Sequence, residues 1–181
     1  MKNLFLLFSV TVILLATSIV CSAAGPWRGK VIDAETKRPI GGAVVVAVWH
    51  KVKDLPLGPY TSNIDAIETV TDKDGNFEIP ATSFLYIPFL REIKGPYFTI
   101  FKPSYGYFPR YAKLKEPHPV TPFEGISTVV EMTKWKTAEE RKQNLLSGDI
   151  IGIPRKKYNL LIKAINEESR AIGLPTYPEE K

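Results

Sequence analysis

Short runs of alternating apolar and polar residues follow one another through most of the chain. Residues 27–31, 76–79 and 126–132 alternate with a period of two, which is typical of strands with one buried face. Residues 43–49 are valine-rich and apolar on both faces, so we expect a central strand covered on both sides. Residues 97–102 indicate another strand. Short strands with no helices between them favour a mainly β fold, an antiparallel β-sandwich whose two sheets enclose one core.

Turn signals separate these runs. Residues 50–66 are rich in proline and glycine, and we expect a long connection there. The segment TDKDGNFEIP has the acid spacing of a calcium loop from Asp72 onward, but its twelfth position is Ser83, where such a loop needs a bidentate Glu. Gly75 instead supplies the positive φ of a tight turn. The segment therefore predicts a hairpin turn and no metal site.

The pattern changes after residue 134. Thr137 and Glu140 have the spacing of a capping box, which predicts a helix that begins there and runs to about Leu146. A second helix is expected after Pro154, because apolar residues then recur at helical spacing. These residues are Tyr158, Leu161, Ile162, Ile165 and Ile172. Residues 135–181 are thus predicted to form a helical pair that either packs on or beside the strands or docks a partner or a second copy.

The N-terminal residues 1–24 have the pattern of a secretory signal peptide. Residues 4–20 carry no charge, and small residues follow them, so cleavage is expected between Ala24 and Gly25. The mature chain would then be exported to the periplasm or the cell surface. Two alternatives stay open: the segment is kept as a membrane anchor, or Cys21 is lipidated and the protein is a membrane-anchored lipoprotein. A membrane contact is expected only in those two cases.

Composition narrows the function classes. The chain has 181 residues, of which 44% are hydrophobic and 24% charged, as in ordinary globular proteins. Its net charge of +5 is modest and its basic residues are scattered, so a nucleic-acid partner is not expected. Cys21 is the only cysteine, so cleavage leaves no thiol for a disulfide, a thiolate metal site or a nucleophile. We expect no cofactor.

Two stretches, WRGKVIDAETKRPIGGAVVVAVW and ETVTDKDGNFEIP, resemble the carboxypeptidase regulatory-like family of transthyretin-like (prealbumin-like, Ig-like) β-sandwich domains. The residues that carry the resemblance are Gly29, Val31, Asp33, Pro39, Ile40, Gly42, Ala43, Thr71, Asp72, Gly75 and Phe77. The resemblance covers about residues 27–134 and implies one sandwich domain at 25–134. It also implies an accessory module that serves attachment, folding or binding.

Aromatic residues are concentrated between residues 84 and 111, which hold ten of the twenty in the chain. Several lie in a loop rich in proline and glycine beside basic side chains, an arrangement that suits a sugar ring or a protein surface. The candidate ligand-binding residues are Tyr105, Tyr107, Tyr111, Lys102 and Arg110. The alternative is that these tyrosines pin their own loop.

A search for catalytic motifs finds no nucleophile elbow, no H-E-x-x-H and no phosphate-binding loop. His50 and His118 are the only histidines. We therefore expect a non-catalytic binding or structural module whose partner is a protein or polysaccharide of the cell envelope. The alternatives are a carbohydrate-binding module that uses the tyrosine loop and a small transthyretin-like hydrolase or ring-processing enzyme. Such an enzyme would place one of the histidines in a pocket with a charged partner.

Overall fold

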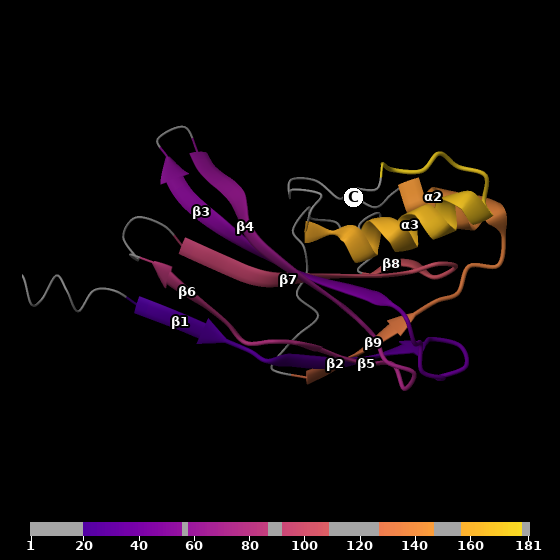
Figure 1. The fold of residues 1–181 in the computed structure, drawn as a ribbon, viewed down its shortest axis with the longest axis horizontal. Helices are drawn as coiled ribbons and strands as arrows, with labels where there is room; N and C mark the ends of the chain where they lie inside the picture. The colour runs from indigo at the N-terminus through magenta and orange to yellow at the C-terminus, as the bar shows by residue number, and fades with distance from the viewer. Residues whose placement is uncertain (1–19, 56–57, 87–91, 109–126, 147–156, 179–181) are drawn as a thin grey trace, which may run out of the picture.

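A computed structural model describes residues 20–55, 58–86, 92–108, 127–146 and 157–178. These residues form a mainly β fold with two helices (Figure 1). The strands are β1 (Val20–Ala24), β2 (Trp27–Asp33), β3 (Val44–Leu55), β4 (Gly58–Val70), β5 (Asn76–Ile79), β6 (Thr82–Tyr86), β7 (Glu92–Lys102), β8 (Gly106–Phe108) and β9 (Ser127–Met132). The helices are α2 (Ala138–Leu146) and α3 (Asn159–Ala171).

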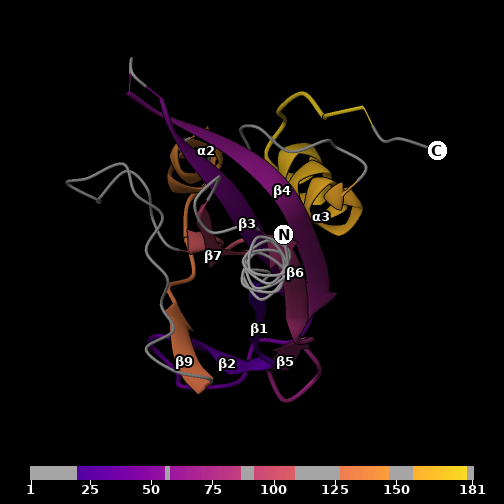
Figure 2. The ribbon, with the colours of Figure 1, turned by 90° about the vertical axis from the view of Figure 1, so that its left-hand side faces the viewer.

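The strands make three sheets. Their orders are β4-β3-β7-β8, β5-β2-β9 and β1-β6. Figure 2 shows the three-stranded sheet on the opposite side of the four-stranded sheet from the helices. Every pair is antiparallel except β2 with β9, which run parallel, so the expectation of a purely antiparallel arrangement is wrong at that edge. The alternating pattern of residues 126–132 could not reveal this, because it is the same for either direction.

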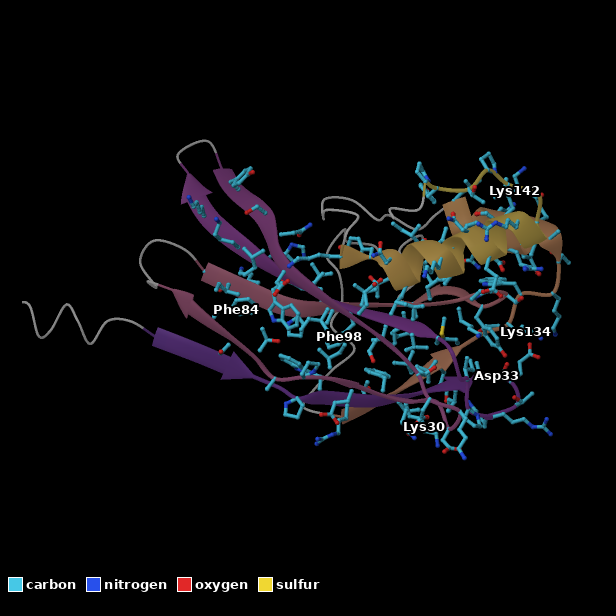
Figure 3. All side chains as sticks on the ribbon, in the orientation of Figure 1. Lys30, Asp33, Phe84, Phe98, Lys134 and Lys142 are labelled. Carbon is cyan, nitrogen blue, oxygen red and sulfur yellow. The ribbon has the colours of Figure 1, made fainter. Side chains whose placement is uncertain are left out.

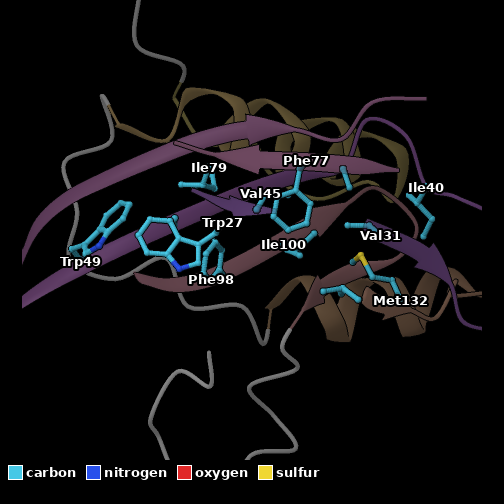
Figure 4. Close-up of a cluster of buried hydrophobic side chains, with 13 residues drawn as sticks. Trp27, Val31, Ile40, Val45, Trp49, Phe77, Ile79, Phe98, Ile100 and Met132 are labelled. Carbon is cyan, nitrogen blue, oxygen red and sulfur yellow. The ribbon is translucent and has the colours of Figure 1, made fainter. Parts of the chain in front are cut away.

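The main core lies between the three- and four-stranded sheets (Figure 4). Trp27 of β2 meets Trp49 of β3 and Phe98 of β7 edge-on, with ring centroids 5.7 and 6.4 Å apart. Val31, Val45, Ile79 and Ile100, from four different strands, are fully buried in the same cluster. Burying each such side chain stabilises the fold by about 1.5–3 kcal/mol relative to exposure.

The other face of the four-stranded sheet is covered by α3. Val44, Val46 and Phe101 form a second buried cluster with Leu161 and Ile165 of the helix. Strand β3 is therefore buried on both faces from Val44 to Ala47, and Val48 is partly buried, in agreement with the covered strand that the composition predicts for residues 43–49. Both predicted helices are confirmed.

Caps fix where both helices begin. The backbone N–H of Glu140 donates to Thr137 Oγ1 at 3.2 Å, and Glu140 Oε2 accepts from the Thr137 N–H at 3.0 Å, so the predicted capping box is confirmed. Helix α3 is capped from another element instead, because Glu68 of β4 accepts from the N–H groups of Leu160 and Leu161 at 3.0 and 2.9 Å.

Two local expectations are wrong. Residues 50–66 are not a long connection: β3 continues to Leu55 and β4 begins at Gly58, so both strands run past the main body (Figure 1). The sequence hides this ribbon because proline and glycine mark its tip and an irregularity at Trp49/His50 breaks the alternation. The tight turn at Gly75 is present, with φ of 78°, but β4 and β5 belong to different sheets and form no hairpin.

The last residues of the predicted signal peptide form a strand. Val20–Ala24 is β1, which pairs with β6 in a separate two-stranded sheet. In the ranges that the structure describes, no helix is long and apolar enough to cross a membrane. Residues 1–19, on which the signal-peptide prediction chiefly depends, lie outside those ranges.

Candidate functional site

A groove of about 550 Å³ runs along the three-stranded sheet to the end of β4, and we call it the sheet groove. It is lined by Arg28, Gly29, Lys30, Thr69, Val70, Asp72, Asn76, Phe77, Glu78, Thr128 and Val129. Figure 3 shows Lys30 on the side of β2 that faces away from the helices. A smaller cavity of about 310 Å³ lies where α2 ends and the chain continues beyond α3.

Strand pairing brings the charged side chains of the sheet groove together. Arg28 and Glu78 are register partners in β2 and β5, and Arg28 Nε donates to Glu78 Oε2 at 2.8 Å. Lys30 comes two residues later in β2, so it follows Arg28 on the outward face. Its register partners are Asn76 of β5 and Val129 of β9. Cross-strand pairs of this kind hold each polar side chain against its neighbour at the surface.

Asp72 supports the turn at one end of the sheet groove. Its Oδ1 accepts from the N–H groups of Asn76 and Asp74 at 2.8 and 2.9 Å. The Asn76 N–H is the largest cause that lowers the pKa of Asp72, and the charge of Lys30 adds to it. The acid spacing that resembles a calcium loop thus serves the turn. No group of three potential metal ligands occurs among the residues that the structure describes.

Apolar side chains stand at the surface beside these charges. Val129 is 60% exposed and Val70 is 42% exposed. Gly29 and Phe77 line the same groove and fit closely against each other, since a β-carbon on Gly29 would lie 2.5 Å from the end of the Phe77 ring. The sheet groove therefore combines apolar patches with charges of both signs, which sequence reasoning missed because its residues come from four strands.

Three of the five predicted ligand-binding residues lie in the described part of the chain. Tyr107 is 6% exposed and packs against Phe101, with ring centroids 4.7 Å apart and the ring planes tilted by 51°. Lys102 Nζ donates to the carbonyl of Gly42 at 3.3 Å. Tyr105 is half-buried against the main core. The tyrosine rings do not form an exposed patch together.

Tyr111 and Arg110, the other two predicted residues, lie outside the described residues. Ligand binding by the set of five stays a prediction.

Tyr105 is held by Asp33 at the end of β2. Its hydroxyl donates to Asp33 Oδ2 at 2.9 Å, while Oδ1 accepts from the N–H groups of Thr36 and Glu35 at 2.7 and 2.9 Å. The Thr36 N–H is the main cause that lowers the pKa of Asp33 to about 2. Burial, followed by the bond to Asp33, raises the pKa of Tyr105 to about 12. Both groups keep their charge state across the physiological pH range, as structural groups do.

A buried ion pair lies next to this loop. Glu168 of α3 is 2% exposed and accepts from Arg141 Nε and Nη2 of α2, both at 2.7 Å. The Ser104 N–H also donates to Glu168, at 2.9 Å. The side chain of Trp135 donates to the carbonyl of Tyr105 at 2.8 Å. These contacts tie the β7–β8 turn to both helices.

His50 follows the irregularity in β3. Its ring lies against Tyr97, with centroids 5.0 Å apart, and its buried Nδ1 has no hydrogen-bond partner. Burial lowers the pKa of His50, and a hydrogen bond with Asn63 opposes that shift. His50 lines neither the sheet groove nor the smaller cavity. His118 lies outside the described residues.

No family model matches the chain, and no curated protein matches it. Among solved structures, a 9R-lipoxygenase from Cyanothece PCC8801, whose crystal structure was determined at 2.7 Å, aligns with 87% of this chain at 12% identity and a TM-score of 0.27. The chain covers 24% of that lipoxygenase. Agreement at this level is too low to carry an argument about fold or function.

Proposed function

We propose that the chain is an exported, non-catalytic binding module of the carboxypeptidase regulatory-like type, and that its sheet groove holds a segment of a polypeptide partner. In this proposal, residues 25–134 form a transthyretin-like sandwich and residues 135–181 are a helical extension. The main core between two sheets supports a sandwich. So do Asp33 and Thr71, two residues of the resembling motifs, because both hold turns between strands.

The observation that carries the proposal is the composition of the sheet groove. Val70 and Val129 are exposed on a surface that also holds the Arg28–Glu78 ion pair and Lys30. Protein-binding surfaces combine apolar contacts with a polar rim in this way. A partner segment would cover the valines, and an acidic side chain of that segment would pair with Lys30.

Carbohydrate binding has less support. Sugar rings stack on exposed aromatic faces. Tyr107 and Phe101 instead pack against each other inside the second cluster, and the Tyr105 hydroxyl donates a hydrogen bond to Asp33.

The perturbed acids support a non-catalytic role. Asp33 and Asp72 accept hydrogen bonds from turn N–H groups, and Glu68 accepts from the start of α3. Each therefore serves the fold itself. A shifted pKa in a cleft would indicate a catalytic group. Asp33 and Glu68 do not line the sheet groove. Asp72 does line it, but the main cause of its lowered pKa is a hydrogen bond from the Asn76 N–H of its own turn.

Selection from a random peptide library, followed by affinity measurement, tests the proposal. Lys30→Glu and Val129→Glu change the sheet groove, whereas Lys163→Glu makes the same charge change as Lys30→Glu on the exposed side of α3. We expect selected peptides to lose at least about tenfold in affinity for the two groove variants, because about 1.4 kcal/mol, one lost ionic or apolar contact, is tenfold. Lys163→Glu should bind as the wild type does.

Equal affinity for all three variants would refute the groove as the binding site. Thermal stabilisation by oligosaccharides, with no peptide selected, would favour the carbohydrate alternative instead.

A further inference from the structure

Strand β6 is paired with β1 in an antiparallel ladder. The register pairs Val20 with Tyr86, Cys21 with Leu85, and Ala24 with Thr82. The sheet has only these two strands in the part of the chain that the structure describes. Residues 20–24 are also the residues that precede the predicted cleavage site, so the strand that occupies β6 belongs to the segment expected to be removed.

The position of β6 does not depend on β1 alone. The β2–β5 ladder ends at Trp27 and Ile79, and β6 follows β5 after two residues. On the side of the main core, Phe84 packs against Trp49 with ring centroids 5.7 Å apart. These two anchors keep β6 beside the core when β1 is removed.

A strand that keeps its place and loses its neighbour exposes a row of N–H and C=O groups. Such an edge is a template for another extended chain, which supplies the missing hydrogen bonds. The chemistry of the occupant follows from β1, whose sequence VCSAA consists of small and β-branched residues. A segment of the same kind fits opposite Thr82, Ser83 and Phe84.

We propose that β6 is a strand-acceptor edge, which pairs with β1 while residues 1–24 are attached and with an extended segment of a partner polypeptide after they are removed. The partner segment runs antiparallel to β6 and is rich in small and β-branched residues. This inference rests on the removal of residues 1–24 that is part of the proposed function. It adds a second contact with a polypeptide, distinct in its lining residues from the sheet groove.

The first part of the test uses the full chain, with its leader attached, carrying Leu85→Cys. Residues directly opposite in an antiparallel pair have β-carbons about 4.5–5.5 Å apart, within reach of a disulfide after small adjustments. We expect oxidised glutathione to close a bond between Cys21 and the new cysteine. Thr82→Cys is the control, since position 82 pairs with Ala24 and lies three residues out of register. Equal rates of closure in both variants would overturn the β1–β6 register.

The second part uses the processed Leu85→Cys protein isolated from an exporting host, after its N-terminus has been determined. If the chain begins at Gly25, the new cysteine is its only thiol. The probe is a synthetic peptide of residues 18–24 whose cysteine is joined to glutathione by a disulfide. The protein thiolate attacks the sulfur of the peptide cysteine, a disulfide forms between protein and peptide, and glutathione leaves as its thiol. We expect this peptide to react at least about tenfold faster than a scrambled peptide of the same composition, because strand pairing aligns the two sulfurs before exchange.

The outcomes separate the two proposals. A chain that begins at Gly25 but reacts equally with both peptides refutes the acceptor edge and leaves export intact. A mature chain that still contains residues 20–24 refutes the removal of β1, and the open edge with it, while the first part still reports on the register.

Discussion

The buried ion pair between Arg141 and Glu168 gives the sharpest test of how the helices are held. The Glu168 carboxylate accepts three hydrogen bonds, two from the guanidinium and one from the Ser104 N–H. Arg141→Met removes the first two and leaves a carboxylate that is 2% exposed. Hydrogen bonds to charged groups contribute about 1.5–3 kcal/mol each, and breaking a buried pair from one side costs about 3–5 kcal/mol.

We expect a loss of about 3 kcal/mol in the free energy of unfolding for Arg141→Met. The lower end of the range applies because the Arg141 side chain is 21% exposed, so water can reach part of the space that it leaves. With a urea dependence of about 2 kcal/mol per molar, the unfolding midpoint should fall by about 1.5 M. Tryptophan fluorescence during urea unfolding measures this, because Trp27 and Trp49 lie in the main core.

The control is Lys37→Met, which removes another 2.8 Å contact with a carboxylate. Lys37 and Glu131 are 60% and 49% exposed, and exposed pairs contribute only about 0–1 kcal/mol. Replacing both buried partners, Arg141→Met with Glu168→Leu, should recover most of the loss and leave about 1 kcal/mol for the unpaired Ser104 N–H. If Arg141→Met shifts the midpoint no further than Lys37→Met does, the reasoning is refuted.

Three further predictions concern single groups. Burial lowers the folded-state pKa of His50 below its ordinary 6.5, so the folded protein binds fewer protons than the unfolded chain does, and stability should fall as the pH drops through 6.5. The urea midpoint of the wild type should therefore decrease between pH 7.5 and 5.5 by more than that of His50→Gln. Parallel plots of midpoint against pH for the two proteins would contradict this. The pKa of Asp33 is lowered to about 2 from 3.8, so its stabilising effect is present above pH 3.8 and is lost as the pH falls through 2. In Tyr105→Phe, NMR of the carboxyl group should report an Asp33 pKa that is higher than in the wild type. It should stay below 3.8, because the Thr36 N–H still donates to Asp33. Gly75→Ala should destabilise the protein by about 1–3 kcal/mol, because φ is 78° and the new β-carbon would clash with the backbone oxygen of Val31. Gly58→Ala, at a φ of 118° with open space around it, should cost less. Equal shifts of the thermal unfolding midpoint in the two variants would show that the close approach to Val31 is unimportant.

The sequence predicts a strand or helix where one face of the element is buried in a core, because apolar residues then recur at the period of that element. Residues 76–79 alternate in burial as their composition indicates, and Leu161, Ile162 and Ile165 are buried at the helical spacing that predicts α3. The capping box at Thr137 is equally local, because both partners lie within one turn of the chain. Such signals need no knowledge of distant neighbours.

Other features depend on residues far apart in the chain and were therefore missed. Tyr105 and Tyr107 stand in a turn rich in glycine and proline, a composition that indicates an exposed loop, but α2, α3 and the end of β2 supply partners that cover them. The sheet groove has the same origin, since its charges come together only through the pairing of β2 with β5 and β9. Strand pairing across sequence gaps leaves no periodic signal.

The parallel pairing of β2 with β9 has a consequence for the order of folding. Lys37, just after β2, binds Glu131 of β9 across 94 positions of sequence. Contacts of such long range close late, because the entropy of loop closure must be overcome before they contribute, and they slow folding. During synthesis, β2 therefore has β5 as a ladder partner first, and its pairing with β9 cannot form until Met132 has left the ribosome.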